Sequence, residues 1–219
     1  EMSALWRQKN VFSFEDMSTL NRAAQIIHSI LGSNVPDMAD WRFGPGASYA
    51  LSGIRSGLIP KMRTKPEVTY QAKDFVYRNL QGSAYTSSFS RSEFGPPSLL
   101  PIVPGDRLAL VSKEIFKPRI MAIQPLGNMC SQLGIEGVLR RKFYRYSGID
   151  ITTQPEVHHE LLGDIFGTID LSSASDSICT ELVEFLLPRK WFEVLDDLRC
   201  KHTVVEIKDS KILKPNRKF

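Results

Sequence analysis

The sequence predicts an α+β fold built from long helices and separate β-hairpins. Apolar residues recur at helical spacing in two long stretches, one after Ser13 and one after Pro125. Two pairs of short apolar runs, within 108–123 and 203–213, have the lengths and separations of hairpin strands. Hydrophobic residues make up 42% and charged residues 24% of the 219-residue chain, an ordinary globular composition with enough apolar surface for a core.

The net charge of +4 is distributed unevenly along the chain. Residues 101–150 contain eight Lys and Arg against four Asp and Glu, and residues 201–219 contain six against two. Residues 151–200 contain ten acids against three bases. An acidic block between two basic ones suits a site that binds metal centrally and a polyanion around it, although a solvated surface of mixed sign gives the same counts.

The cysteines and the apolar runs exclude several classes of protein. Three cysteines without CxxC spacing indicate neither a disulfide framework nor a zinc site, and they fit a reducing compartment. No apolar run approaches the ~20 residues that a membrane-spanning helix needs, and residues 1–10 lack the pattern of a signal peptide.

The first expected element is a helix over residues 14–31. Ser13 is a favourable N-cap with Asp16 in the first turn, and Gly32 stands where a C-terminal cap is expected. Between them, apolar residues keep to one face of the helix.

Three loops are expected between this helix and residue 100. Glycines on both sides of Pro45 predict a tight turn flanked by Arg42 and Ser48, which either presents backbone N–H groups to a phosphate or is simply a turn. The alternating cations of 61–65 predict a basic edge or an exposed loop. Residues 81–98, rich in Ser, Gly and Pro, predict a long loop.

A basic hairpin is expected over residues 108–123. Its strands, 108–112 and 120–123, enclose Lys113, Lys117 and Arg119. Three cations on two short strands and their turn can converge on one anion, and a triphosphate carries several negative charges within a few ångströms. A solvated basic hairpin is the alternative.

The next element is a helix from Pro125 to about Gly148 that ends in basic residues. Arg140, Arg141 and Lys142 near its C-terminus either complement the helix dipole or form, with the neighbouring aromatic residues, a track for a nucleic-acid backbone. A polar loop is expected over residues 154–159.

The stretch 164–177 has a strand–acid–turn–acid pattern. A short strand over 164–169 is expected to end at Asp170, and a turn of small residues leads to Asp176 at the start of the next helix. Such a pair of acids is suited to holding a divalent metal beside a phosphate, whereas Asp176 is equally explained as a stabilising acid in a first helical turn. A helix over 189–200 and a hairpin over 203–213 complete the chain.

These motifs together resemble the RNA-directed RNA polymerase, the replicase beta subunit, of the single-stranded RNA bacteriophages. The resemblance is clear over about half the chain and follows nearly all of it in order. The residues that carry it are Arg42–Ser48, Lys113, Arg119, Ile120–Pro125, Asn128–Met129, Gln132–Ile135, Val138–Arg140, Gly148–Asp150, Ile169–Ile178, Leu186–Pro188 and Trp191–Leu195.

The resemblance implies a right-hand polymerase, with fingers over 1–163 and the start of the palm over 164–219. It implies that Asp170 is the catalytic carboxylate that binds two Mg²⁺ ions and that Asp176 lies near the ribose of the incoming nucleotide. Lys113, Lys117 and Arg119, in the basic motif over about 108–125, are expected to bind the triphosphate. Arg42, Arg140, Arg141 and Lys142 are the residues expected to bind RNA.

The same resemblance implies nucleotidyl transfer on an RNA template from nucleoside triphosphates, in the cytoplasm of a bacterial host and away from membranes. It also implies the host translation elongation factors Tu and Ts as partners.

One departure from the family pattern limits the expected activity. The palm needs a Gly-Asp-Asp hairpin for its other metal ligands, and none occurs in this sequence, where Gly105-Asp106 is followed by Arg107. We therefore expect the chain to be an incomplete part of the polymerase, with no activity alone. The alternative hypothesis is a non-catalytic RNA-binding module in which the acidic turn is structural.

Overall fold

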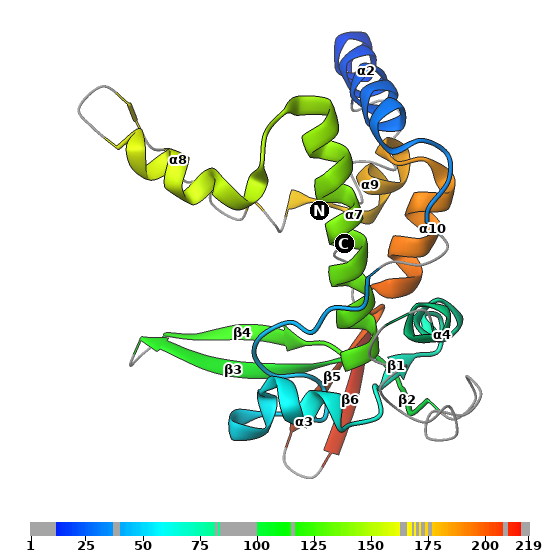
Figure 1. The fold of residues 1–219 in the computed structure, drawn as a ribbon, viewed down its shortest axis with the longest axis vertical. Helices are drawn as coiled ribbons and strands as arrows, with labels where there is room; N and C mark the ends of the chain where they lie inside the picture. Colours follow the sequence, from blue (N-terminus) through cyan, green and yellow to red (C-terminus); the bar gives the residue numbers. More distant parts are fainter. Residues whose placement is uncertain are drawn as a thin grey trace. The chain divides into compact units, whose positions relative to one another are not determined.

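The computed structural model in Figure 1 describes residues 12–36, 40–81, 83, 100–114, 117–162, 166, 167, 169, 171, 174, 177–207 and 210–215. Helices and strands occur together, which confirms the predicted α+β class. The chain forms two compact units, each assembled from segments that are distant in sequence. The first unit contains residues 1–34 and 137–192, and the second contains residues 35–136 and 193–217. The division predicted at 163/164, between fingers and palm, is a functional one and stays a prediction.

A four-stranded sheet with the order β4-β3-β5-β6 forms much of the second unit. β3 (Asp106–Glu114) pairs antiparallel with β4 (Lys117–Ile123), and β5 (His202–Ile207) pairs antiparallel with β6 (Ser210–Pro215). Both predicted hairpins are thereby confirmed. A short parallel contact between β3 and β5 joins them, with Asp106 opposite Thr203 and Arg107 opposite Val204.

This contact depends on Gly105, which lies directly against the backbone of β5. A Cβ atom at Gly105 would overlap the carbonyl of His202, so a side chain here would push the two hairpins apart. Beyond Arg107, β3 and β4 continue as a two-stranded ribbon, and the side chains of Leu110 and Ile120 on it are each 65% exposed.

The core of the second unit forms where a small parallel sheet meets the start of a long helix. The sheet consists of β1 (Val68–Thr69) and β2 (Ile102–Val103), and the helix is α7 (Leu126–Ser147). Gly127 allows their close approach, because a Cβ atom there would lie 2.5 Å from Cγ1 of Val68. The other elements of this unit are η1 (Gly53–Ser56), α3 (Leu58–Met62), α4 (Lys73–Gln81) and the second half of α10 (Arg189–Leu198).

The first unit is helical in the part of the chain that the structure describes. The helix α2 (Phe14–Leu31) near the N-terminus has the predicted bounds and packs against α9 (Thr180–Leu186). Oγ of Ser13 accepts from the backbone N–H of Asp16 at 3.1 Å, and the Asp16 carboxylate accepts from the N–H of Ser13 at 2.9 Å. This reciprocal cap fixes the start of the helix, and Gly32, at φ 68°, ends it.

The C-terminal end of α2 is held by the buried side chain of Trp191. The indole of Trp191, at the start of α10, is fully buried and donates to the carbonyl of Gly32 at 3.1 Å. The preceding residue, Lys190, donates to the side-chain oxygen of Asn34 at 3.2 Å on the surface.

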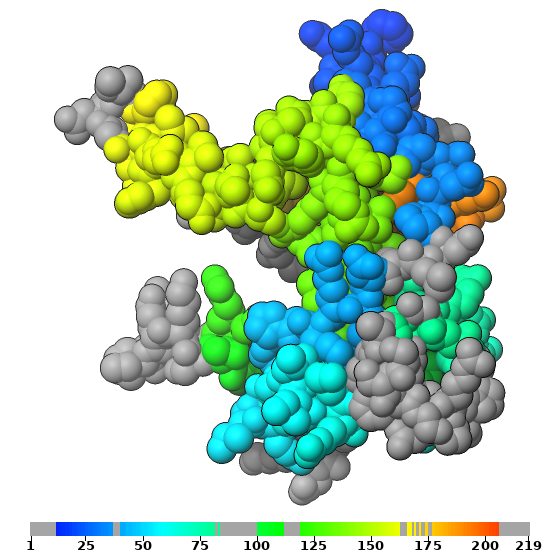
Figure 2. Space-filling view, in the orientation of Figure 1, coloured from blue at the N-terminus to red at the C-terminus, as the bar shows by residue number. Residues whose placement is uncertain are grey.

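The polar loop predicted over 154–159 is wrong, because these residues form α8 (Gln154–Glu160) after the short helix η3 (Ile151–Thr153). The Asp150 carboxylate caps η3 by accepting from the N–H of Thr152 at 2.8 Å. Pro155 in the first turn of α8 then fixes a helical backbone angle. The space-filling view shows this segment in yellow at the surface (Figure 2). Val157 on α8 is 41% exposed.

The predicted strand over 164–169 falls largely outside the described residues, and the three that are described, Phe166, Gly167 and Ile169, are not in a strand. A strand needs a hydrogen-bonded neighbour, and neither sheet formed by the described strands includes this segment. The helix that follows is confirmed, but α9 starts at Thr180 with Cys179 as its N-cap. Asp176 therefore precedes the first turn that was expected to contain it. No helix among the described residues is long and apolar enough to cross a membrane.

Asp106 provides a pH-dependent test of the junction between β3 and β5. Its side chain is 2% exposed and its Oδ1 has no hydrogen-bond partner among the described residues. Burial raises the pKa of this carboxyl, and a hydrogen bond with Thr203 opposes that shift. Because the native pKa is raised, the protonated carboxyl contributes to the stability of the folded protein. This contribution is lost as the pH rises through the native pKa.

We predict that Asp106→Asn makes the protein more stable at pH 7, on the order of 1 kcal/mol, because it removes a charge that is buried at that pH. The gain should be smaller at pH 4, because the raised pKa leaves a larger share of the wild-type carboxyl protonated in acid. Urea unfolding at both pH values measures the difference. The exposed Glu184→Gln on α9 is the matched control, and an equal effect of the two variants at pH 7 would contradict the prediction.

Candidate functional site

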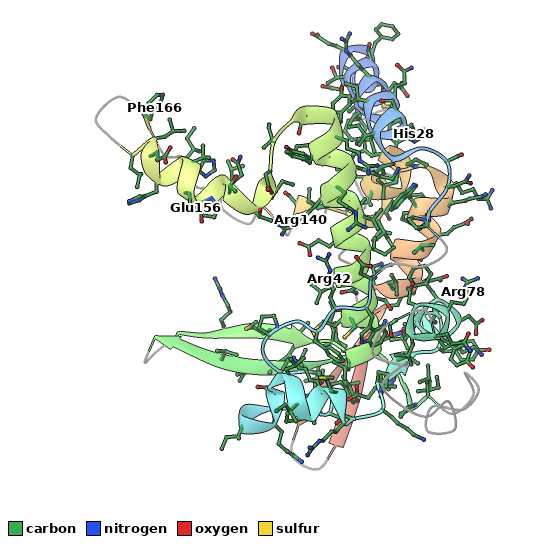
Figure 3. All side chains as sticks on the ribbon, viewed as in Figure 1. His28, Arg42, Arg78, Arg140, Glu156 and Phe166 are labelled. Carbon is green, nitrogen blue, oxygen red and sulfur yellow. The ribbon has the colours of Figure 1, made fainter. Side chains whose placement is uncertain are left out.

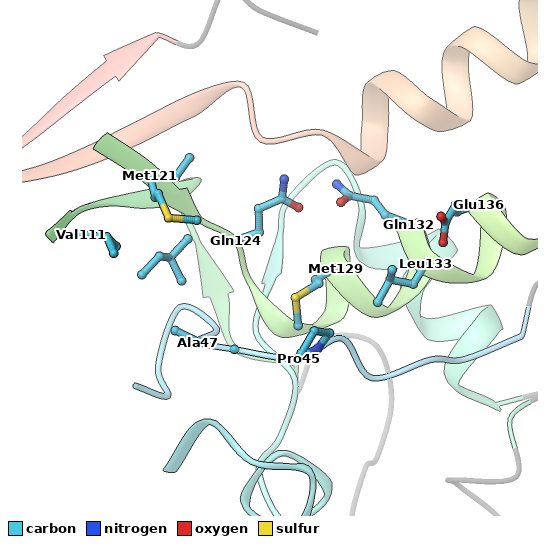
Figure 4. A pocket seen from close by; sticks show the side chains of 12 residues that line it. Pro45, Ala47, Val111, Met121, Gln124, Met129, Gln132, Leu133 and Glu136 are labelled. Atoms are coloured by element: carbon cyan, nitrogen blue, oxygen red, sulfur yellow. The ribbon is translucent and has the colours of Figure 1, made fainter. Parts of the chain in front are cut away.

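A pocket of about 550 Å³ opens in the second unit between the turn around Pro45, the β3–β4 ribbon and α7 (Figure 4). The turn contributes Pro45, Gly46 and Ala47. The ribbon contributes Val111 and the segment from Met121 to Gln124, and α7 contributes Met129, Gln132, Leu133 and Glu136. Several of these residues belong to the motifs predicted from the sequence, so the fold brings those motifs together around one cavity.

The buried carboxylate of Glu67 fixes two walls of this pocket. One oxygen accepts from the backbone N–H of Ala50 at 2.7 Å, and the other accepts from that of Leu126 at 3.2 Å. The backbone carbonyl of Glu67 also accepts from Gly127 at 2.9 Å. Glu67, which is 5% exposed, therefore satisfies N–H groups at the start of α7 that have no partner within the helix. Its negative charge also suits the positive, N-terminal end of the helix dipole.

Lys61 holds the turn of the pocket in place. Its Nζ donates to the carbonyl of Gly44 at 2.6 Å, and the whole residue is buried. Gly44 itself lies against α7, because a Cβ there would come within 3.0 Å of the Leu133 side chain. The prediction of a basic edge or exposed loop is therefore wrong for Lys61, and burial lowers the pKa of its amine.

The tight turn predicted around Pro45 is confirmed, with Gly46 at φ 77°. Its connection to β4 is a backbone hydrogen bond from Tyr49 to the carbonyl of Gln124 at 2.8 Å. The Nε of Arg107 in β3 donates to the carbonyl of Tyr49 at 2.7 Å. These bonds give the turn a structural role, and binding of phosphate by its N–H groups stays a prediction.

Two polar side chains on α7 bind the end of α10. Asn128 and Gln132 are one helical turn apart, and each donates to the carbonyl of Leu198 at 2.9 Å. Asn128 also accepts from the N–H of Thr69 at 3.0 Å and donates to its hydroxyl at 2.9 Å. The buried carbonyl at the C-terminus of α10 is thereby satisfied, so these two motif residues are explained by packing.

The three cations predicted to bind a triphosphate lie on the β3–β4 hairpin, but within its strands, which extend beyond the predicted 108–112 and 120–123. Lys113 occupies the register shift between Ser112 and Glu114, and Lys117 is the first residue of β4, but the side chains of both fall outside the described residues. Arg119 is exposed on β4, directly opposite Val111. Opposite residues of an antiparallel pair share a face of the sheet, so Arg119 is on the face whose Val111 lines the pocket.

The other predicted cations are divided between the two units, and Figure 3 labels Arg42 and Arg140. Arg42 is exposed on the segment that leads to the pocket turn, 3.6 Å from the carboxylate of Asp40, which is a weak surface ion pair. Arg140, Arg141 and Lys142 lie on the part of α7 that belongs to the first unit. Lys142 is placed over the ring of Trp191 at 5.9 Å, which gives this cation a structural contact.

The two predicted acids, Asp170 and Asp176, lie outside the described residues. Within the described ranges, no group of three His, Cys, Asp or Glu side chains is arranged to hold a metal ion. The described part of the chain therefore does not by itself fit a magnesium centre. Its cysteines are free and buried, and burial raises the pKa of the Cys130 and Cys200 thiols to about 12, which makes them unreactive near neutral pH.

A family model described as RNA replicase, beta-chain, matches residues 4–214. This chain belongs to the RNA replicase beta-chain family. The matched range includes the pocket, the basic ribbon and the predicted acidic stretch, so the resemblance inferred from the motifs is confirmed over nearly the whole chain.

Individual relatives agree with the family assignment. The RNA-directed RNA polymerase subunit beta of Qbeta virus (strain MX1) is 32% identical over 189 residues, which cover 83% of this chain and 30% of the relative. The RNA-directed RNA polymerase subunit beta of Enterobacteria phage SP is 30% identical over 210 residues, which cover 90% of this chain and 35% of the relative. The RNA-directed RNA polymerase beta chain of Escherichia phage MS2 is 34% identical over 182 residues, which cover 80% of this chain and 29% of the relative. The chain thus spans about a third of the length of these replicase relatives.

Several residues that build the site carried no clear signal in the sequence. Glu67 and Lys61 are buried polar residues in a segment that has no strong periodicity, and their partners are backbone groups far along the chain. Asn128 and Gln132 could have been recognised as inward-facing, because their spacing places both on one face of the helix.

We predict that Asn128→Ala destabilises the protein by about 2–4 kcal/mol, because it leaves buried groups of Thr69 without partners and removes one of the two hydrogen bonds to the carbonyl of Leu198. Denaturant unfolding monitored by circular dichroism measures the loss. Asn34→Ala is the matched control, since it removes one exposed hydrogen bond to Lys190 and should cost at most about 0.5 kcal/mol. Equal losses for the two variants would show that the buried network is unimportant.

Proposed function

We propose that this chain contributes the fingers and the opening of the palm to a right-hand RNA-directed RNA polymerase. The reaction is template-directed nucleotidyl transfer from nucleoside triphosphates to a growing RNA. Family membership supports the reaction class, and the exposed Arg119 on a basic ribbon beside a pocket is the structural observation that carries the proposal.

In the proposed site, Lys113, Lys117 and Arg119 bind the triphosphate. Phosphoryl and nucleotidyl transfer require neutralisation of charge on the phosphates, and guanidinium and ammonium groups supply it. The ribbon is suited to this role, since the described part of it is open to solvent beyond its contact with β5. Asp176 is proposed to lie near the ribose of the incoming nucleotide.

Magnesium enters the proposal through Asp170. The carboxylate of Asp170 would hold two Mg²⁺ ions together with further carboxylates, which the described residues do not provide. When bound, the ions would supply charge stabilisation for the transferring phosphoryl group. The family resemblance supports this assignment.

RNA binding is assigned to Arg42, Arg140, Arg141 and Lys142. Arg42 and Arg141 are exposed, which suits contacts with a phosphate backbone. The contact of Lys142 with the ring of Trp191 indicates that Lys142 also has a structural role. The proposed setting is the cytoplasm of a bacterial host, with RNA template and product as partners and translation elongation factors Tu and Ts as host subunits.

In the complete polymerase, Asp170→Ala should reduce nucleotide incorporation to background and leave RNA affinity within about twofold, because the carboxylate acts on the reacting phosphate and not on the RNA backbone. Primer extension and a filter-binding assay measure the two properties. Glu184→Gln, which changes an exposed carboxylate on α9, is the control. Parallel loss of both properties would favour the alternative function, a non-catalytic RNA-binding module.

The 219-residue chain alone should not extend a primed template, since its sequence has no Gly-Asp-Asp to complete the carboxylates of the palm. The measurement is incorporation of labelled nucleotide with Mg²⁺, with a complete phage replicase as the positive control. Turnover by the chain alone that is abolished by Asp170→Ala would overturn this prediction.

A further inference from the structure

The segment that contains η3 and α8 presents apolar side chains to solvent. Five large apolar residues in it are between 41% and 62% exposed: Ile149, Ile151, Val157, Leu161 and Leu162. Val157 and Leu161 are one helical turn apart, so they form an apolar stripe along α8. Single exposed apolar residues are ordinary on a protein surface, whereas several together mark an interaction site.

The core of the first unit makes little use of this stripe. Within the described part of that unit, α8 packs mainly against η3, which directly precedes it. In Figure 1, α8 lies apart from α2 and α9, which pack against each other. The exposure of the stripe is therefore not explained by the packing of the unit to which it belongs.

The formal charge around the stripe is entirely negative. Residues 146–188 contain eight Asp and Glu and no Lys or Arg. On α8 the acids are Glu156 and Glu160, which are exposed and also one turn apart. Each directly precedes a residue of the apolar stripe, so an acidic stripe borders the apolar one along the helix.

These charges decide which class of partner fits the surface. Carboxylates repel the phosphates of RNA and of anionic lipids, so the acidic stripe disfavours both. A basic protein surface is attracted instead, and charge complementarity also orients it. A helix with an apolar face bordered by Lys or Arg matches both stripes at once, because its side chains recur with the same spacing.

We propose that α8 is a docking surface for a basic, amphipathic helix of a partner protein. Apolar side chains of the partner cover Val157 and Leu161, and its Lys or Arg side chains pair with Glu156 and Glu160. This goes beyond the proposed polymerase function, since none of these four residues is assigned to nucleotide, metal or RNA. It gives the acidic part of the chain a role in protein recognition.

The test uses three labelled peptides of about 18 residues, which is roughly five helical turns. The first has leucines on one helical face and lysines elsewhere, and the second has glutamate in place of lysine. The third has the same leucine and lysine composition without a single apolar face. Fluorescence anisotropy with the 219-residue chain should show the first peptide binding at least about tenfold more tightly than the other two.

Variants of the chain separate the two stripes. Leu161→Ser should weaken the first peptide by about tenfold, because an exposed apolar contact is lost. Glu160→Lys should weaken the first peptide and strengthen the glutamate peptide, changing their affinity ratio by about tenfold or more. The matched controls are Ile54→Ser, a fully exposed residue on η1, and Glu184→Lys, an exposed residue on α9, and both should leave the affinities unchanged.

Equal affinity of the unaltered chain for the three peptides, or no binding of the first at about millimolar concentration, overturns the proposal without requiring any variant to fold. Full affinity in Leu161→Ser also overturns it, since charge alone would then explain binding. Two further measurements on Leu161→Ser examine other occupants. Loss of self-association in sedimentation would assign the surface to a second copy, and loss of affinity for oligouridylate would assign it to RNA, and either result overturns the proposal.

Discussion

The buried carboxylate of Glu67 is the interaction on which the second unit depends. It accepts hydrogen bonds from Ala50 and Leu126, and so it joins the chain after the Pro45 turn to the start of α7. A buried negative charge is tolerated at a helix N-terminus, where unpaired N–H groups and the dipole replace water. The position of α7 then determines where Met129 and Gln132 meet the ribbon, so the geometry of the pocket follows from this contact.

Local structure was predictable because its causes are local. The cap formed by Ser13 and Asp16 and the glycine at 32 are adjacent to the helix that they delimit. The two hairpins are likewise set by short apolar runs and their turns, whereas the parallel contact that joins them depends on the absence of a side chain at Gly105, which no periodicity reveals. The wrong prediction at 154–159 has a local cause instead, because a cap at Asp150 and a proline at 155 outweigh polar composition.

The candidate site was predictable in its chemistry and less so in its arrangement. Arg119 could be assigned to a basic hairpin from the sequence, and the structure places it in that hairpin, on β4 and not in the connection between the predicted strands. Lys61 shows the limit: a lysine in a basic stretch is usually solvated, but this amine is buried on the carbonyl of Gly44, a partner 17 residues earlier in the chain. Contacts of this kind depend on tertiary structure, which a single sequence does not encode in any local pattern.

The polar residues of the second unit fall into two groups according to whether the fold satisfies them. Asn128 and Glu67 have all their described bonds within the protein, so their side chains act on stability. Gln124 differs, because its backbone carbonyl is bound by Tyr49 while its side-chain oxygen is buried without a described partner. Gln124 is therefore a residue whose backbone the fold fixes while its buried side-chain oxygen carries the cost of an unmade hydrogen bond.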